Sequence, residues 1–516
     1  MKILLLSPYS CVISYGVRIL SACLKQDGHD SSILFLPQTD ERGLTCYNSS
    51  VVDQILELAL DKDLIGISLM SNNYLIIKDL CNRLKEKLNI PIALGGVHPT
   101  VSYHDCLDFS DYIFRGESEL AFREFIANFR TKIPGMLSTT DNLVYKENGN
   151  VFVNSIKLPL NLDKLPFPDY DDDHFVIMHN KLLRMTFNIL QLFLKNEYMI
   201  FPTRGCPFQC AYCCNNSFHK LYKDNQIFRK RSAQNVINEL LWYKEIMEAD
   251  YLKLNDDGFM ALSEEYLKEF VELYKSKVDL PIAIGSLSPM MAGRIERKLD
   301  ILRPLDITFV KMGVQSGSEN TRKNIYLRND SNEDILKTSK ALVDRGIKYT
   351  IDIILDNPFE EEEGLIETIL FLTELKKANC VTYYSLAFYP GTYLYNRAIQ
   401  EKLIPDDWSK VIKMKYGYYW EVSPILINKL VMCSCMLSKN TAKAILRLKK
   451  NNLFLFRLTV NGLYRLYKMR NFTLNNVQKI VGILRGKRLK GKLNRRLLGL
   501  KETIWLNSLR ARNNTS

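Results

Sequence analysis

The sequence contains no run of about 18 apolar residues, so it predicts no membrane-spanning helix. Its first eight residues, Met1 to Pro8, are too short an apolar run for a secretion signal and instead predict a first strand. The twelve cysteines have no paired spacing, which argues against a disulfide framework and favours a reducing compartment. From these absences we expect a cytoplasmic protein.

The chain has 516 residues, of which 47% are hydrophobic and 25% charged, a composition typical of roughly three globular domains. The net charge of +13 is unevenly distributed. Residues 441–516 contain 19 Lys or Arg and a single acidic residue, Glu502, for a balance of +18, so the remainder of the chain stands at −5. The basic character therefore belongs to the C-terminal segment.

Three cysteines, Cys206, Cys210 and Cys213, have the spacing Cys-x3-Cys-x2-Cys. Three thiolates leave one iron of a cubane cluster without a protein ligand, so that this iron can bind a small chelating molecule. Zinc is the alternative, but a structural zinc site needs four ligands. The nearest candidates, Cys214 and His219, supply no second ligand pair, and the spacing therefore favours an iron–sulfur cluster.

This segment resembles the motif of the radical S-adenosylmethionine superfamily. Tyr212 matches the aromatic position of that motif, and the flanking Arg204-Gly205 and Pro207-Phe208 are similar to it as well. The resemblance implies a [4Fe-4S] cluster that cleaves S-adenosylmethionine to a 5′-deoxyadenosyl radical, with Tyr212 beside the cofactor. It also implies an electron donor such as flavodoxin or ferredoxin.

The first part of the chain alternates apolar segments with amphipathic ones, which predicts an α/β fold with a parallel sheet. Strands are expected at 3–6, 32–36, 64–69, 92–94 and 112–114, with a helix at 17–25. In such a sheet a ligand binds at the carboxyl ends of the strands. The small or polar residues expected there are Ser7, Ser68, Gly95, Gly96, His98, Gly116 and Glu117.

The order Gly95-Gly-Val-His-Pro-Thr100 followed by Arg115-Gly-Glu-Ser-Glu119 resembles the cobalamin-binding domain of one large radical S-adenosylmethionine subfamily. No Gly-x-Gly-x-x-Gly occurs, which argues against a dinucleotide. The Asp-x-His-x-x-Gly motif is also absent, so no histidine is assigned as an axial cobalt ligand. The alternative is a sheet that has kept this fold and lost the corrinoid.

Residues 141–195 are expected to connect two domains, with a hairpin turn at Asn148-Gly149 and a helix at 182–194. From Tyr198 the α/β pattern resumes, with further strands at 249–254, 309–314, 349–355 and 382–388. This order is the one that the resemblance implies for a partial (β/α) barrel, whose chemistry lies at the strand ends.

The same resemblance places S-adenosylmethionine contacts after two of these strands. Asp256 or Asp257 would contact its methionine portion, and Gln315 and Ser316 its sugar or carboxylate. The alternative for either aspartate is a turn or a helix cap. The sequence identifies no catalytic residue beyond these cofactor contacts.

The combination resembles the cobalamin-dependent radical methyltransferases and implies methyl transfer to an unactivated carbon of a lipid or specialised metabolite. One alternative is a radical cyclase or carbon–carbon bond-forming enzyme with the same cofactors. A methylthiotransferase of transfer RNA is another, suggested by Gly313-Val-Gln-Ser-Gly-Ser, although the cysteines for its second cluster are not at matching positions. A non-catalytic corrinoid-binding sensor is the third.

The last quarter of the chain carries no motif and is expected to be mainly helical. Beyond Thr441, basic residues alternate with apolar ones at helical spacing, a pattern suited to peripheral contact with an anionic membrane. A solvated helical tail is the alternative, and nucleic acid is not the expected partner. The predicted organisation is 1–140 as a Rossmann-like cobalamin-binding domain, 141–195 as connector, 196–400 as radical barrel and 401–516 as a basic helical region.

Overall fold

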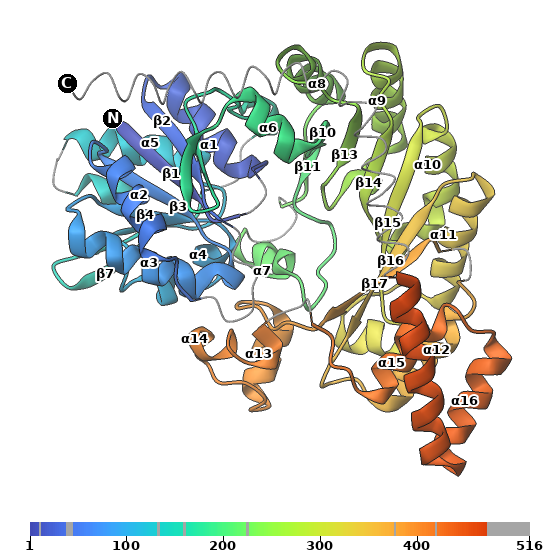
Figure 1. Ribbon diagram of the computed structural model, residues 1–516. Coiled ribbons are helices and arrows are strands. Elements are labelled where there is room, and N and C mark those ends of the chain that lie inside the picture. Colours follow the sequence, from blue (N-terminus) through green and yellow to red (C-terminus); the bar gives the residue numbers. More distant parts are fainter. Residues whose placement is uncertain are drawn as a thin grey trace, which may run out of the picture. The chain divides into compact units, whose positions relative to one another are not determined.

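The computed structural model describes residues 1–9, 12–37, 45–131, 135–157, 161–222, 227–375, 378–417 and 421–471. The chain divides into two compact units, Met1–Ser423 and Pro424–Ser516. The first unit contains two large sheets, and the described part of the second is helical (Figure 1). Among the described residues, no helix combines the length and apolar character needed to cross a membrane.

The first sheet has nine strands in the order β7-β6-β5-β4-β3-β1-β2-β8-β9. Strands β1 to β5 and β8 pair with their neighbours in parallel, whereas the hairpins β6/β7 and β8/β9 add antiparallel pairs at the two ends of the sheet. The strands are β1 (Lys2–Ser7), β2 (Asp30–Phe35), β3 (Leu64–Ser68), β4 (Ile92–Gly95), β5 (Tyr112–Phe114), β6 (Leu143–Glu147), β7 (Asn150–Val153), β8 (Phe175–Met178) and β9 (Lys181–Arg184).

Helices connect the parallel strands of this sheet in the doubly wound manner predicted for the first part of the chain. The contacts of α1 with α5, and of α2 with α3, are those expected when right-handed crossovers reverse direction at β1 and place helices on both faces. These helices are α1 (Tyr15–Gln26), α2 (Ser49–Ala59), α3 (Tyr74–Lys87), α4 (Val97–Val101) and α5 (Glu119–Thr131).

The segment between the two sheets contributes four strands to the first of them. The expected hairpin forms, with Asn148 and Gly149 at φ 50° and 80° as a tight two-residue turn requires. The helix expected at 182–194 is wrong at its start: residues 181–184 pair with β8, and α6 covers only Phe187–Leu194. Thr186 caps that helix by accepting a hydrogen bond from the Ile189 amide at 3.4 Å.

The second sheet has six parallel strands in the order β10-β13-β14-β15-β16-β17, the arrangement of a partial barrel. Its strands are β10 (Glu197–Ile200), β13 (Tyr251–Leu254), β14 (Ile282–Leu287), β15 (Ile307–Gln315), β16 (Tyr349–Leu355) and β17 (Cys380–Ser385). Sequence reasoning missed β14, whose apolar run is short and broken by Gly285 and Ser286. A small ladder joins β11 (Thr203–Arg204) to β12 (Arg229–Lys230).

Helices α7 (Cys214–Leu221), α8 (Ala233–Ile246), α9 (Glu264–Lys277), α10 (Ile295–Leu302), α11 (Asn332–Asp344) and α12 (Glu362–Leu372) follow the barrel strands, and α13 (Tyr393–Gln400) and α14 (Trp408–Val411) complete the first unit. Trp408 is 1% exposed, and its indole nitrogen donates to the Ser71 carbonyl at 3.0 Å. Its ring also packs near His98, with 6.3 Å between ring centroids. The chain thus returns to the first sheet after the barrel is complete.

The described part of the second unit contains α15 (Leu426–Ser434), α16 (Lys439–Asn451) and a further helix at residues 453–471. This bears out the expectation of helical structure up to residue 471. Residues 472–516, which carry much of the predicted basic tail, lie outside the described residues.

Candidate active site

The loop of residues 205–213, here called the cluster loop, connects β11 to α7 and carries all three motif cysteines. Cys210 is buried, and Cys206 and Cys213 are half-buried. Gly205 has φ 76°, and a Cβ there would lie 2.2 Å from the Ile227 carbonyl oxygen, so only glycine fits. The chain thus enters the cluster loop through a turn that no other residue can make without moving its neighbour.

Backbone contacts fix the shape of the cluster loop. A His219 ring nitrogen lies 2.8 Å from the Cys206 carbonyl oxygen, and the Ala211 amide donates to the Tyr326 carbonyl at 2.9 Å. The His219 ring is therefore engaged in holding the loop. Of the two nearby residues considered as a fourth metal ligand, Cys214 is the other. Cys214 begins α7 and is within hydrogen-bonding reach of Cys213.

Two nitrogen donors approach the cysteine sulfurs. The Asn215 amide lies 3.6 Å from Cys213 Sγ, and Arg328 Nη1 lies 3.8 Å from Cys210 Sγ. Such N–H···S contacts accompany the thiolates of iron–sulfur clusters and tune their potentials. A set of three shielded sulfurs with neighbouring donors fits a [4Fe-4S] cluster whose fourth iron has no protein ligand.

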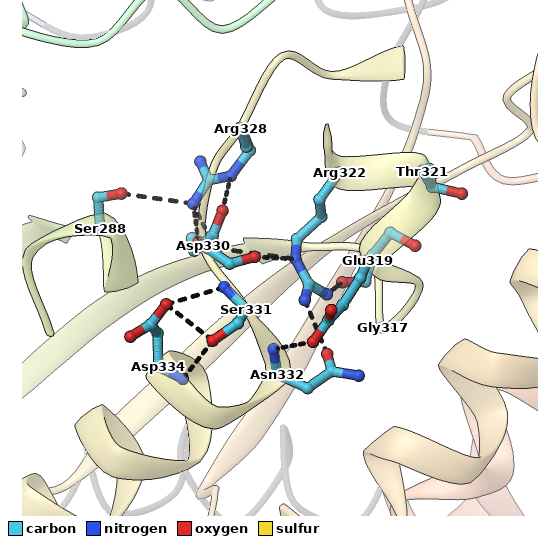
Figure 2. A network of polar contacts seen from close by, with 12 residues as sticks. Ser288, Gly317, Glu319, Thr321, Arg322, Arg328, Asp330, Ser331, Asn332 and Asp334 are labelled. Atoms are coloured by element: carbon cyan, nitrogen blue, oxygen red, sulfur yellow. Dashed lines mark hydrogen bonds and ion pairs between the residues drawn. The ribbon is translucent and has the colours of Figure 1, made fainter. Parts of the chain in front are cut away.

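Arg328 is a central residue of this site that sequence reasoning missed. Its guanidinium is buried and donates to Tyr212 Oη at 3.3 Å and to the Gly313 carbonyl at 2.9 Å. It also donates to Asp330 at 3.1 Å (Figure 2). It therefore connects the aromatic motif residue to the end of β15. An isolated Arg in a loop of polar residues has no distinguishing signal in a single sequence.

A second buried arginine, Arg322, supports the same region (Figure 2). Arg322 donates to the Ser316 carbonyl at 2.5 Å, to the Asp330 carbonyl at 3.1 Å and to Asn332 Oδ1 at 2.7 Å. Because each donor has an acceptor inside the protein, Arg322 holds the loop after β15 in place.

The structure separates the two aspartates that the sequence left as alternatives. Asp256 is buried, and its carboxylate accepts hydrogen bonds from the amides of Thr203, Gly258 and Phe259 at 2.9, 3.2 and 2.7 Å. Burial raises the pKa of Asp256 to about 6, although these bonds lower it. The carboxylate is thus occupied in joining the end of β13 to β11.

Asp257 faces the cluster loop. It is exposed and accepts a hydrogen bond at 3.0 Å from Asn215, the residue that also approaches Cys213. Its negative charge contributes to raising the pKa of Cys206, after burial, which is the larger cause. Asp257 is therefore the member of the pair that can reach a ligand at the cluster.

Gln315 and Ser316 also differ. Gln315 ends β15 with φ 73°, and a Cβ added to Gly313 would lie 2.8 Å from its amide nitrogen, so its side chain covers Gly313. Ser316 is 1% exposed and donates to Glu360 Oε1 at 3.0 Å. Gln315 is thus available at the barrel rim, whereas the Ser316 hydroxyl is engaged within the protein.

A cavity of about 610 Å³ lies at the carboxyl ends of the first sheet. Its lining includes Ser68, Gly95, Gly96, Gly116 and Glu117, five of the seven residues that the sequence predicted at the strand ends. The cavity also reaches Thr203 and Arg204 of β11, the last residues before the cluster loop. We call it the corrinoid cavity, after the ligand that the sequence predicts there.

The other two predicted residues, Ser7 and His98, are not part of the lining. The Ser7 hydroxyl is buried 2.5 Å from the Ser14 hydroxyl, which does line the cavity. His98 is fully buried, with Nδ1 3.0 Å from Ser71 Oγ, and burial lowers the pKa of its imidazole to about 3. His98 therefore packs in the core beside Trp408 and does not face the cavity.

Two of the lining glycines have backbone angles and close neighbours that exclude a side chain, whereas the third has free space beside it. Gly96 and Gly116 have φ 107° and 75°, and a Cβ on Gly116 would lie 2.1 Å from Tyr222 Oη. A Cβ on Gly95 would meet only Phe114 Cβ, at 4.0 Å. A glycine edge beside an open, largely apolar space is what a broad, flat corrin ring requires, so these residues fit a corrinoid.

An ion cluster joins the corrinoid cavity to the cluster loop. Arg204 pairs with Glu117 at 2.8 Å and with Glu119 at 2.7 Å, and Arg229 also pairs with Glu117. Burial, the largest single influence, would raise the pKa of Glu119, but the charge and hydrogen bond of Arg204, a backbone hydrogen bond and the Arg229 charge together lower that pKa. Because Arg204 directly precedes Gly205, these ion pairs tie the edge of the cavity to the start of the cluster loop.

A second group of polar contacts, centred on Glu239, also connects the cavity lining to the barrel. Tyr15 lines the cavity and donates to Glu239 Oε2 at 2.9 Å, while Tyr198 and Arg231 approach the same carboxylate at 2.5 and 2.6 Å. Glu239 is 0% exposed, and these three donors satisfy its carboxylate inside the protein. Charged groups thus join the two parts of the first unit at two places, one half-buried around Arg204 and one buried around Glu239.

Comparison with known proteins agrees with this division of the chain. Residues 1–126 match the B12 binding domain family, and residues 200–372 match the Radical SAM superfamily. These domains account for the cofactors expected from the sequence, namely cobalamin, a [4Fe-4S] cluster and S-adenosylmethionine.

The similar proteins differ in their reactions. The anaerobic magnesium-protoporphyrin IX monomethyl ester cyclase of Synechocystis sp. is 24% identical over 326 residues, which cover 60% of this chain and 58% of the cyclase. The cytidylyl-2-hydroxyethylphosphonate methyltransferase of Streptomyces wedmorensis is 21% identical over 397 residues, with coverages of 66% and 70%. The chain thus spans less than two thirds of that cyclase.

Among solved structures, the radical S-adenosylmethionine methyltransferase TsrM from Kitasatospora setae, with cobalamin and a [4Fe-4S] cluster bound, has a similar fold. The TM-score is 0.60, the sequence identity is 12%, and 78% of each chain is covered. The predicted fold class, a parallel-sheet domain followed by a radical domain and a helical C-terminal region, is confirmed.

Proposed function

We propose that this chain, a cobalamin-dependent radical S-adenosylmethionine protein built from a B12-binding and a radical domain, methylates an unactivated carbon of a lipid or specialised metabolite. One observation carries the proposal: the corrinoid cavity extends to Arg204, the residue immediately before the cluster loop. Both cofactors would therefore meet at the same end of the barrel.

When bound, the cluster with S-adenosylmethionine supplies hydrogen abstraction from carbon, and the corrinoid supplies a transferable methyl group. Cys206, Cys210 and Cys213 would hold the cluster, with Asn215 donating to the sulfur of Cys213 and Arg328 to that of Cys210. Asp257 would bind the amino group of S-adenosylmethionine, because its carboxylate is exposed beside the loop. Tyr212 and Gln315 would contact the remainder of that cofactor.

Three residues that the sequence predicts as cofactor contacts have a positioning role in this proposal. Asp256 and Ser316 position the cofactor loops, since their polar atoms already have protein partners. His98 holds the Ser71 loop beside the cavity. None of the three is required to touch a cofactor directly.

The inner face of the barrel supplies candidate substrate contacts. Along β15, Lys311, Gly313 and Gln315 share the half-buried face, while the alternating Val310, Met312 and Val314 are buried. Lys311 Nζ lies 3.0 Å from Asp352 on β16 and 3.1 Å from Tyr384 Oη on β17. We propose that this polar group binds a polar or ionic part of the substrate below the cofactors.

The proposal is tested with the full chain purified without oxygen, in which iron, sulfide and corrinoid are quantified together. A reduced sample supplied with S-adenosylmethionine should release both 5′-deoxyadenosine and S-adenosylhomocysteine. The second product forms only when the methyl group leaves S-adenosylmethionine. Release of 5′-deoxyadenosine alone, from protein that contains corrinoid, would contradict methyl transfer.

A radical cyclase is the second candidate, and the similarity to the Synechocystis cyclase favours it. Cyclisation removes hydrogen from a substrate and adds no CH₂ unit. The same product analysis therefore distinguishes the two candidates, because a cyclase consumes S-adenosylmethionine without forming S-adenosylhomocysteine.

A further inference from the structure

The helix at residues 453–471 has two opposite apolar faces. One face is buried: Phe456 and Val460 are 1% and 0% exposed. Lys429 of α15 contacts the same helix, with its ammonium 2.9 Å from Asn461 Oδ1 and over the Tyr464 ring. This side of the helix is therefore occupied by protein contacts.

The opposite face carries an exposed apolar stripe. Phe454, Leu458 and Leu466 are 72%, 56% and 60% exposed, and Leu455 beside them is 43% exposed. Phe454 and Leu458 are one helical turn apart, and Leu466 lies two turns further, so these side chains line one side of the helix. Large apolar side chains gathered on one helix face mark an interaction surface more often than isolated ones do.

The charge around the stripe has one sign. Between residues 424 and 471 the sequence contains ten Lys or Arg and no Asp or Glu. Arg457, Arg465 and Lys468 of the helix are exposed, and α16 adds five further basic residues. An apolar stripe accompanied by cations, with no acidic residue between 424 and 471, complements a surface with apolar depth and anionic head groups.

We propose that this stripe docks the protein on the surface of an anionic lipid bilayer. Phe454, Leu455, Leu458 and Leu466 enter the head-group boundary, while Arg457, Arg465 and Lys468 contact lipid phosphates. A nucleic acid would use the cations and leave the apolar side chains in water. The exposed stripe therefore favours the bilayer over RNA.

The experiment measures co-sedimentation of the cofactor-loaded full chain with vesicles of phosphatidylcholine containing 30% phosphatidylglycerol, and with phosphatidylcholine alone. Binding to the anionic vesicles is expected and should weaken between 0.1 and 0.5 M salt, because the charges are screened. F454E/L458E should lower the vesicle partition coefficient by about tenfold or more. R457Q should lower it by about fivefold, on the anionic vesicles only.

Leu60→Glu is the matched control, because Leu60 is 70% exposed in the first unit and lies outside the stripe. This variant should bind vesicles as the unchanged protein does. Equal binding of L60E and F454E/L458E would overturn the proposal. So would concentration-dependent dimerisation that F454E/L458E abolishes without vesicle binding, since a second copy would then cover the stripe. Retention on RNA that is insensitive to F454E/L458E, with no vesicle binding, would also overturn it.

Discussion

The two sheets of the first unit provide ligand space in different ways. In the first sheet, five of the six residues of β1 and five of the six of β2 are buried, so both faces of these strands are covered. In the second sheet, β15 alternates between half-buried and buried residues. The first sheet therefore has room for a ligand only at the ends of its strands, whereas the second leaves an inner face accessible.

This difference teaches how two cofactors and a substrate are separated on one chain. In our proposal, a flat corrinoid binds at the glycine-rich edge, and the polar face of β15, β16 and β17 is left for a substrate. The cluster loop lies where the two regions meet, and Arg204 connects them. Substitutions that act on one region and spare the other test the comparison.

The largest effect is expected at the cluster loop. Cys213→Ala should abolish iron–sulfur absorbance and reductive cleavage of S-adenosylmethionine, since only two thiolate ligands remain. Cys214→Ala should retain both, although its thiol lies beside that of Cys213. Iron and sulfide content with visible spectra provide the measurement. Equal loss of cluster in the two variants would show that our ligand set is wrong.

The next effect concerns the first sheet alone. Gly95→Leu should weaken hydroxocobalamin binding roughly tenfold to hundredfold, because the added side chain enters the corrinoid cavity. Gly293→Leu is the control, since a Cβ there meets nothing within 4 Å and lies outside the lining. Corrinoid titration followed by absorbance measures the change. Unaltered hydroxocobalamin affinity in G95L would show that the corrinoid does not bind in this cavity.

Substitution of the two neighbouring aspartates should affect different properties, cofactor affinity for Asp257 and stability for Asp256. Asp257→Ala is expected to weaken S-adenosylmethionine binding about tenfold through loss of a charge-assisted contact, with little change in stability. Asp256→Asn should lower the free energy of unfolding by about 2 kcal/mol, because its amide group cannot accept all the bonds of the carboxylate. Calorimetric titration and urea unfolding separate the two. A matched loss of affinity and stability in both variants would contradict the division of roles.

The last effect is a pH dependence at the rim of the second sheet, which only a comparison at two pH values can detect. Burial raises the pKa of Glu360 to about 7, while Thr321 and Ser316 donate to its carboxylate at 2.9 and 3.0 Å. The folded chain therefore keeps this proton where the unfolded chain has lost it. Stability should fall as the pH rises from the unfolded pKa toward 7, by about 2 kcal/mol relative to Glu360→Gln.

Urea unfolding at pH 5 and pH 8 checks this expectation, with the exposed Glu363→Gln as control. E363Q should show the same pH dependence as the unchanged chain. If E360Q also kept the full dependence, the titrating group would lie elsewhere.

Sequence reasoning succeeded where a local pattern determines structure. The cysteine spacing, the Asn148-Gly149 turn and the long apolar strands each depend on neighbours within a few residues. The strand ends of the first sheet also followed from the α/β order, and five of the seven residues named there line one cavity.

The remainder depends on contacts between distant residues. Arg328 and Glu239 acquire their positions only when separate strands and helices fold together, and no local pattern marks either residue. Ser7 and His98 stand at the expected strand ends but face the core. The alternation of a strand predicts which side a residue faces, but not which side a ligand occupies.

The contact between Trp408 and Ser71 has a consequence for how the chain folds during synthesis. Strands β1 to β5 leave the ribosome early, but the edge strands β8 and β9 and the indole that covers His98 follow only later. Contacts so far apart in sequence slow the final closure of the domain, because much of the chain must be ordered before they form. The B12-binding region is therefore expected to reach its final packing only after the barrel that it serves has been translated.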